Sequence, residues 1–229
     1  MLGGLDWLAL EVKYLDRAQA FYEAFLDLEV RDSTERETVL DVGDSTLVLR
    51  SPGPVPRGGL HTHYAFAIPH DEYDDWHARL AERFDLVEHT FGDATSLYFY
   101  DTEGNCVELG QSDVDGPGID RIFEVVLEVE NLDRARDFYE RLGFEVVGDG
   151  DAERQRVRLS TGPLDLELWE PHLGIADARG GVHVDVGIES PDPAAAVEAV
   201  REDALAVEEI ESGVRVRDLD GHAVSLVRE

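Results

Sequence analysis

Four side chains in this sequence are of the types that bind metal ions or move protons, and their spacing places them on strands. Glu108, Glu124 and Glu167 lie on short predicted strands, each on the face opposite the apolar side chains. His63 lies near the start of another predicted strand. Carboxylates and imidazoles bind divalent cations and act as general acids and bases. In so acidic a chain, however, a single carboxylate is more often a solvated surface group.

The charge balance is extreme and narrows the range of partners. The 229 residues include 20 Lys and Arg against 51 Asp and Glu, which gives a formal charge of −31. Such a field repels nucleic-acid phosphates and anionic lipid head groups, so neither is an expected partner. Lys13 is the only lysine. Acidic residues spread along the whole chain, with almost no lysine, indicate adaptation to high salt, where self-repulsion is screened.

Cysteine usage and hydrophobicity predict a cytoplasmic globular protein. Cys106 is the only cysteine, so a disulfide framework or a thiolate metal cluster cannot form within one chain. No apolar stretch has the length of a membrane span, and the N-terminus lacks the pattern of a signal peptide. We expect a monomer or a homodimer that acts on a small molecule.

The elements that must position the four side chains repeat along the chain. The segment Leu15–Glu23 recurs as Leu132–Glu140, and Asp101–Asn105 recurs as Asp218–His222. Both matches have the same offset of 117 residues. Two matches at one offset, at opposite ends of the unit, indicate a tandem duplication.

The two copies are predicted to form two domains, residues 1–114 and 115–229. Each copy divides into two smaller units. Every unit has the pattern βαβββ, so the chain contains four modules of an α+β fold. A four-stranded sheet with one helix buries only one face, and modules must therefore pair around a shared cavity. The predicted helices are 16–26, 71–84, 133–142 and 192–202.

The βαβββ pattern, the Leu-Asp-Arg-x-x-x-Phe-Tyr helix and the Asp-x-x-Gly turn before the last strand resemble the vicinal oxygen chelate superfamily. That superfamily includes glyoxalase I, bleomycin-binding proteins, fosfomycin-resistance enzymes and extradiol dioxygenases. The resemblance implies curved mixed sheets around cup-shaped cavities, with one metal-ligand position on the first strand of each module and another on its last strand. In modules one to four these positions are Trp7 and Val48, His63 and Glu108, Glu124 and Glu167, and His183 and Ser225.

The resemblance leaves two ways of pairing the modules, and the ligand chemistry favours one of them. Pairing one with two and three with four would split the good ligands between two cavities. Pairing two with three collects His63, Glu108, Glu124 and Glu167 around one divalent ion such as Zn, Ni, Mn, Co or Fe(II). His183 would then be the remnant of a second site, next to Trp7, Val48 and Ser225.

The function that this resemblance implies is a metal-dependent enzyme acting on a small substrate with two adjacent oxygens. Glu124 is the expected catalytic carboxylate. It would detach from the metal ion and then act as a base. No module pair holds the His, His, Glu set of extradiol dioxygenases, so an isomerase or lyase is favoured over a ring-cleaving dioxygenase. Two alternatives stay open. One is a metal-free small-molecule binding protein of the bleomycin-resistance kind, and the other is a degenerate duplicate that acts through partners.

Overall fold

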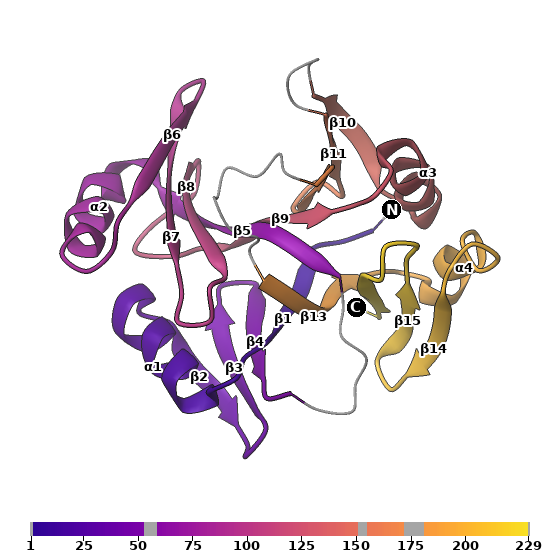
Figure 1. Cartoon of the computed structure of the whole chain (residues 1–229), viewed down its shortest axis with the longest axis horizontal. Coiled ribbons are helices and arrows are strands. Elements are labelled where there is room, and N and C mark those ends of the chain that lie inside the picture. Colours follow the sequence, from indigo (N-terminus) through magenta and orange to yellow (C-terminus); the bar gives the residue numbers. More distant parts are fainter. Residues whose placement is uncertain (1, 53–58, 151–154, 172–180, 229) are drawn as a thin grey trace.

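The computed structural model of the chain describes residues 2–52, 59–150, 155–171 and 181–228. The βαβββ pattern occurs four times, as the sequence predicted, and the fold is α+β. The modules occupy four corners of the molecule, and the first strands of all four meet at its centre (Figure 1). The helices lie at the periphery, on the outer sides of the sheets. None of the described helices is long and apolar enough to cross a membrane.

The first copy contains modules one and two. Module one consists of β1 (Leu5–Glu11), α1 (Leu15–Leu26), β2 (Glu29–Ser33), β3 (Glu37–Val42) and β4 (Ser45–Arg50). Module two consists of β5 (Leu60–Pro69), the 3-10 helix η1 (His70–Glu72), α2 (Tyr73–Ala81), β6 (Val87–Phe91), β7 (Ala94–Tyr100) and β8 (Cys106–Ser112).

The second copy contains modules three and four. Module three consists of β9 (Arg121–Glu128), α3 (Leu132–Leu142), β10 (Glu145–Asp149), β11 (Arg156–Ser160) and β12 (Asp165–Trp169). Module four consists of β13 (Gly181–Glu189), α4 (Pro193–Glu198), β14 (Ala206–Ile210), β15 (Gly213–Arg217) and β16 (Ala223–Val227).

The strand pairing shows which modules share a sheet. In every module the last strand runs parallel to the first, as in the pairs β8 with β5 and β12 with β9. Between modules, β5 pairs antiparallel with β9, and β1 pairs antiparallel with β13. Modules two and three therefore form one curved eight-stranded sheet, and modules one and four form the other. A short pairing of β5 with β13 joins the two.

The duplication is visible in the apolar faces of the helices. Side chains at 3.6-residue spacing pack into the core from both α1 and α3, and three of the four buried positions in each helix correspond at the offset of 117 residues. In α1 the buried residues are Ala18, Phe21, Tyr22 and Leu26, and in α3 they are Ala135, Phe138, Tyr139 and Leu142. Each helix thus covers the outer face of its sheet and leaves the concave face to the cavity.

A buried hydrogen bond fixes each of these helices to the turn before the last strand of the neighbouring module. The hydroxyl of Tyr22 donates to Asp101 at 2.7 Å, and the hydroxyl of Tyr139 donates to Asp218 at 2.9 Å. Asp101 also accepts from the backbone N–H of Asn105 at 2.8 Å. Because β8 begins at the next residue, this turn helps to set the register in which Glu108 enters the sheet.

Two helices are shorter than the sequence predicted. The helix predicted over 71–84 extends only over Tyr73–Ala81, and the one predicted over 192–202 extends only over Pro193–Glu198. At both C-terminal ends the backbone tightens into bonds between residues three apart. Examples are Arg83 N–H to Leu80 O at 3.0 Å and Val200 N–H to Val197 O at 3.1 Å. Such bonds end a helix by satisfying its last carbonyls.

Candidate metal centre

The strand register identifies the equivalent positions of the four modules. In modules one to three, the candidate on the last strand lies beside the residue two positions after the candidate on the first strand, and we apply this spacing to module four. The pairs are Ala9 with Val48, Ala65 with Glu108, Val126 with Glu167, and Gly187 with Ser225. The first-strand positions are therefore Trp7, His63, Glu124 and Asp185.

In module four this register places Asp185, and not His183, at the position equivalent to His63. Asp185 lies 122 residues after His63, more than the 117 residues that separate the repeated motifs, because the connection from β12 to β13 is longer than the one from β4 to β5. Aligning the two histidines, which are 120 residues apart, therefore gives the wrong residue. The backbone of His183 pairs with Leu10. Its side chain lies outside the described part of the structure.

The four ligand candidates of modules two and three face one cavity. His63, Glu108, Glu124 and Glu167 are all buried and line a cavity of about 320 Å³. His63 Nε2 lies 3.1 Å from Glu108 Oε2 and 3.4 Å from Glu124 Oε1. One ligand atom from each of these three residues lies within 4.8 Å of the other two. Modules two and three thus bring together one imidazole and two carboxylates at a spacing that one metal ion can bridge.

Two aromatic rings set the orientation of the His63 imidazole. The rings of Tyr98 and Trp169 both meet it edge to face, with centroids 5.5 and 5.7 Å away. Such contacts fix the plane of a buried ring. The side chain of His63 is 2% exposed, so it cannot swing into solvent. Nε2 is therefore held toward the two carboxylates.

The charges of the site shift the pKa values of its groups. Burial lowers the pKa of His63, but hydrogen bonds and charges from Glu108 and Glu124 outweigh this and raise it to about 9. Burial raises the pKa of Glu124, but bonds from His63 and Arg158 outweigh it and hold the pKa below the usual value. Burial and the neighbouring Glu124 raise the pKa of Glu167. Glu124 is therefore the more firmly ionised of these two carboxylates.

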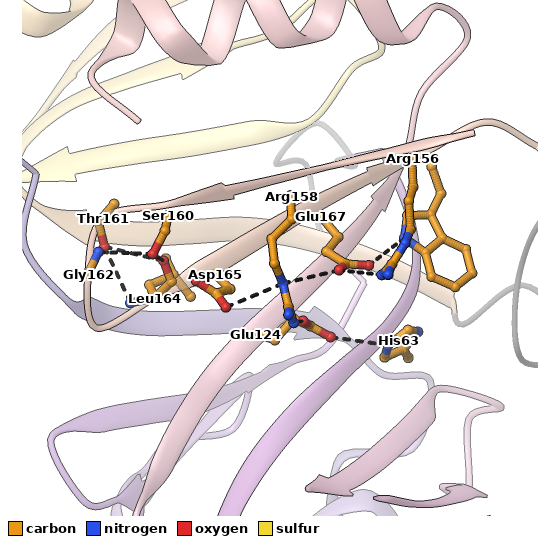
Figure 2. A network of polar contacts seen from close by, with 11 residues as sticks. His63, Glu124, Arg156, Arg158, Ser160, Thr161, Gly162, Leu164, Asp165 and Glu167 are labelled. Atoms are coloured by element: carbon orange, nitrogen blue, oxygen red, sulfur yellow. Dashed lines mark hydrogen bonds and ion pairs between the residues drawn. The ribbon is translucent and has the colours of Figure 1, made fainter. Parts of the chain in front are cut away.

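Two arginines on β11 occupy the mouth of the cavity, and the sequence analysis missed them. Arg158 pairs with Glu124 through Nη2, and its Nε lies 3.1 Å from Glu167 Oε1. Arg156 donates to Glu167 at 2.6 Å. The guanidinium of Arg158 lies between the two glutamates (Figure 2). The strand alternation in Arg-Val-Arg-Leu could have found both arginines, since it places them on the face that carries Glu167.

Glu167 faces the same cavity, but its oxygens have other partners. Besides the two arginines, the indole N–H of Trp169 donates to it at 2.7 Å. Glu167 is not a member of the group of mutually close ligand atoms in the described residues. The structure thus gathers three of the four predicted ligands closely and ties the fourth to cations at the rim.

In the equivalent cup between modules one and four, side chains of the protein itself already bind the carboxylate. Asp185 is fully buried and accepts from Arg215 at 2.7 Å and from Ser225 at 2.7 Å. On the module-one side, Trp7 and Val48 pack in a small apolar cluster. The guanidinium of Arg215 thus takes the place that a metal ion would have at Asp185, and Trp7 and Val48 of module one offer no metal ligand.

The residues of the first cup fit a divalent metal ion. Glu108 Oε2 is buried and has no well-aligned hydrogen-bond donor among the described residues, although His63 Nε2 lies 3.1 Å from it. A buried carboxylate oxygen without a donor is costly unless a cation binds it. One imidazole nitrogen and two carboxylate oxygens would leave coordination positions open for water or substrate, which suits Zn, Ni, Mn, Co or Fe(II).

Comparisons with known proteins agree with this architecture. The family model described as "Glyoxalase/Bleomycin resistance protein/Dioxygenase superfamily" matches residues 4–109. The metallothiol transferase FosB of Staphylococcus haemolyticus is 26% identical over 116 residues, which cover 48% of this chain and 84% of the relative. FosB of Lysinibacillus sphaericus is 27% identical over 112 residues, which cover 46% of this chain and 79% of the relative.

Solved structures extend the similarity to nearly the whole chain at the level of the fold. Glyoxalase I from Zea mays aligns with a TM-score of 0.74 at 20% identity, covering 98% of this chain and 92% of that one. A putative dioxygenase from Bacillus subtilis aligns with a TM-score of 0.74 at 15% identity, covering 99% and 85%. The first copy matches the superfamily model and the four-module fold extends over both copies, so the predicted resemblance to the vicinal oxygen chelate superfamily is confirmed.

Proposed function

We propose that the cup between modules two and three is a divalent-metal site, and that the protein is a metal-dependent enzyme acting on a small substrate with two adjacent oxygens. The observation that carries this proposal is the convergence of His63, Glu108 and Glu124 on one cavity, with one ligand atom from each within 4.8 Å of the others. The set of one histidine and two glutamates differs from the two histidines and one glutamate of extradiol dioxygenases, which supports an isomerase or lyase more than a ring-cleaving dioxygenase.

His63, Glu108 and Glu124 would hold the ion. When bound, it supplies Lewis-acid stabilisation of negative charge on adjacent substrate oxygens. His63 and both carboxylates are nearly fully buried, so the cavity walls keep bulk water away from most of their surface. The edge contacts of Tyr98 and Trp169 keep the imidazole in a binding orientation without further reorganisation.

Glu124 is proposed as the carboxylate that changes partners during turnover. Its Oε1 faces His63, while its Oε2 pairs with Arg158. A carboxylate held between these two cations can release one oxygen while the other stays bound. Glu167 has the raised pKa, which makes it the stronger base of the two in the metal-free state. Comparing Glu124→Gln with Glu167→Gln separates a ligand from a base, because only loss of the ligand removes metal.

Metal analysis tests the proposal directly. The protein is purified in high salt without a metal-binding tag, incubated separately with Zn, Ni, Mn, Co and Fe(II), and dialysed. We expect about one ion per chain for at least one of these metals, and its loss in His63→Ala and Glu108→Gln, because three ligands define the site.

The matched control is Ser225→Ala. Ser225 holds the position in module four that Glu108 holds in module two, and its hydroxyl touches Asp185 and not the candidate site. This variant should keep the full metal content. Metal that persists in His63→Ala, or a wild-type protein that binds none of the five ions, contradicts the proposal.

A metal-free binding protein is the second candidate function, and one observation favours it. Arg158 already pairs with both Glu124 and Glu167, as Arg215 pairs with Asp185 in the cup between modules one and four. On this account the arginines complete the charge balance and the cavity holds an uncharged ligand. Full metal content in the wild type, lost in His63→Ala, would contradict this second candidate.

A further inference from the structure

We propose that Arg156 and Arg158 form an anion subsite at the mouth of the metal cup, so that the substrate carries a carboxylate or phosphate group. This inference rests on the proposed metal site and adds the substrate class to it. Both arginines line the same cavity as His63, Glu108 and Glu124. A ligand that reaches the three metal ligands must therefore pass or touch the guanidinium groups.

The two arginines differ from the carboxylates in their exposure to solvent. The side chains of Arg156 and Arg158 are 32% and 39% exposed, whereas that of Glu167 is 2% exposed. The carboxylates thus form the floor and the guanidinium groups form the rim. Contacts between described residues use Nη1 of Arg156 and Nη2 and Nε of Arg158. The other guanidinium nitrogens carry donors suited to a planar or tetrahedral oxyanion.

The charge of the cavity supports an anion once a divalent ion is present. With a neutral His63, the three glutamates exceed the two arginines by one negative charge. A divalent ion reverses this and leaves one positive charge in a nearly enclosed space. In a chain of formal charge −31, a local positive centre is needed to attract a negatively charged substrate.

Among the described residues, the second cup has a counterpart of Arg158 but not of Arg156. Arg215 lies opposite Ser225 as Arg158 lies opposite Glu167, so the two arginines hold equivalent positions. Two residues earlier, β11 has Arg156 whereas β15 has Gly213. Arg156, which pairs with Glu167, therefore has no counterpart on β15, where the one arginine at this face pairs with Asp185.

Sulfate is a suitable probe, because it presents the oxyanion geometry without forming insoluble salts with the candidate metals. Its binding is measured by titration calorimetry on metal-loaded and metal-free wild type, Arg156→Met, Arg158→Met and Arg158→Lys. Metal content and thermal unfolding are recorded on the same samples. The control is Arg136→Met, because Arg136 also bridges two carboxylates, Glu140 and Asp149, but lies away from the cavity.

We expect the metal-loaded wild type to bind sulfate, and each methionine variant to bind it at least about tenfold more weakly, because a charge-assisted hydrogen bond is lost. Arg158→Lys should fall between them, and Arg136→Met should match the wild type. Metal-loaded wild type that binds no sulfate, or methionine variants within twofold of it, would overturn the anion subsite while leaving the metal site intact. A chain that binds no metal defeats the proposed function instead. Sulfate binding that the methionine substitutions abolish in metal-free protein would still support the subsite.

Discussion

At the scale of single residues, the candidate site depends on one buried histidine between two carboxylates. His63 would be an ordinary strand histidine without Glu108 and Glu124, which come from strands on either side of β5. Those two carboxylates raise the pKa of the imidazole to about 9, despite its burial. The same contacts that favour a proton on Nε2 also favour a metal ion there, so the two compete.

This competition predicts proton release on metal binding. At pH 7.5 the metal-free site holds His63 protonated, since its pKa of about 9 lies above the pH, and a metal-bound imidazole is neutral. Metal binding should release about one proton, and apparent affinity should fall about tenfold for each pH unit below 9. Calorimetry in two buffers of different ionisation enthalpy measures the release. A heat of binding that is independent of the buffer would contradict a protonated His63.

The second cup allows a separate prediction about a buried ion pair. Arg215→Met leaves the fully buried Asp185 without its cation, and should destabilise the protein by about 3–5 kcal/mol. The double variant Arg215→Met, Asp185→Leu removes both charges and should recover much of this loss. Urea unfolding of the two variants measures the difference. Metal content should stay at the wild-type level in both, because neither residue lines the cavity between modules two and three.

At the scale of elements, the four strands that meet at the centre decide which side chains can act together. The alternation of apolar and polar residues was enough to predict the face on which Glu108, Glu124 and Glu167 lie. It could not establish which modules pair, because that depends on contacts between β5 and β9 that are distant in sequence. The pairing was favoured on ligand chemistry, and the sheet topology agrees with it.

The assignment of His183 shows where sequence reasoning failed. Repeats at a constant offset located the helix and the Asp-x-x-Gly turn, but the connection before β13 is longer in the second copy. Only the pairing of Gly187 with Ser225 identifies Asp185 as the residue equivalent to His63. Arg156 and Arg158 were overlooked for another reason, since the search considered only metal-ligating residue types on first and last strands.

The turn that precedes each last strand gives a prediction at this scale. Asp101 accepts hydrogen bonds from the Tyr22 hydroxyl, from the Asn105 amide and from backbone N–H groups. Asp101→Ala should therefore cost about 2–4 kcal/mol of unfolding free energy, measured by chemical denaturation. Asp93→Ala removes an exposed carboxylate and should change the stability by less than about 0.5 kcal/mol. Equal effects of the two substitutions would show that the buried network adds no stability.

At the scale of the whole molecule, two copies of one unit build one candidate site between them. The four good ligands come from the second half of the first copy and the first half of the second copy. The sheets therefore cross residue 114, the predicted boundary between the two domains. The division of the chain into these two domains stays a prediction. The repeated motifs and the pattern of elements in the sequence could predict the α+β fold and its duplication, whereas the shared cup required the register of both central strands.

The excess of acidic residues predicts a strong dependence of stability on salt. With a formal charge of −31, self-repulsion opposes the compact state, and added salt screens it. The Tm of the protein should rise by several degrees or more between about 0.2 and 2 M KCl. The measurement is best made on metal-free His63→Ala as well, so that salt effects on metal binding do not contribute. A Tm that stays constant or falls would contradict adaptation to high salt.

The central claim is that modules two and three together hold one metal ion. Anomalous X-ray diffraction from crystals of metal-loaded protein tests it most directly, because the ion is located without reference to activity. The account predicts one strong anomalous peak per chain, bounded by His63 Nε2, Glu108 and Glu124, in the cavity below Arg156 and Arg158. A peak beside Asp185 and Ser225, or no peak in the first cup at full metal loading, would contradict it.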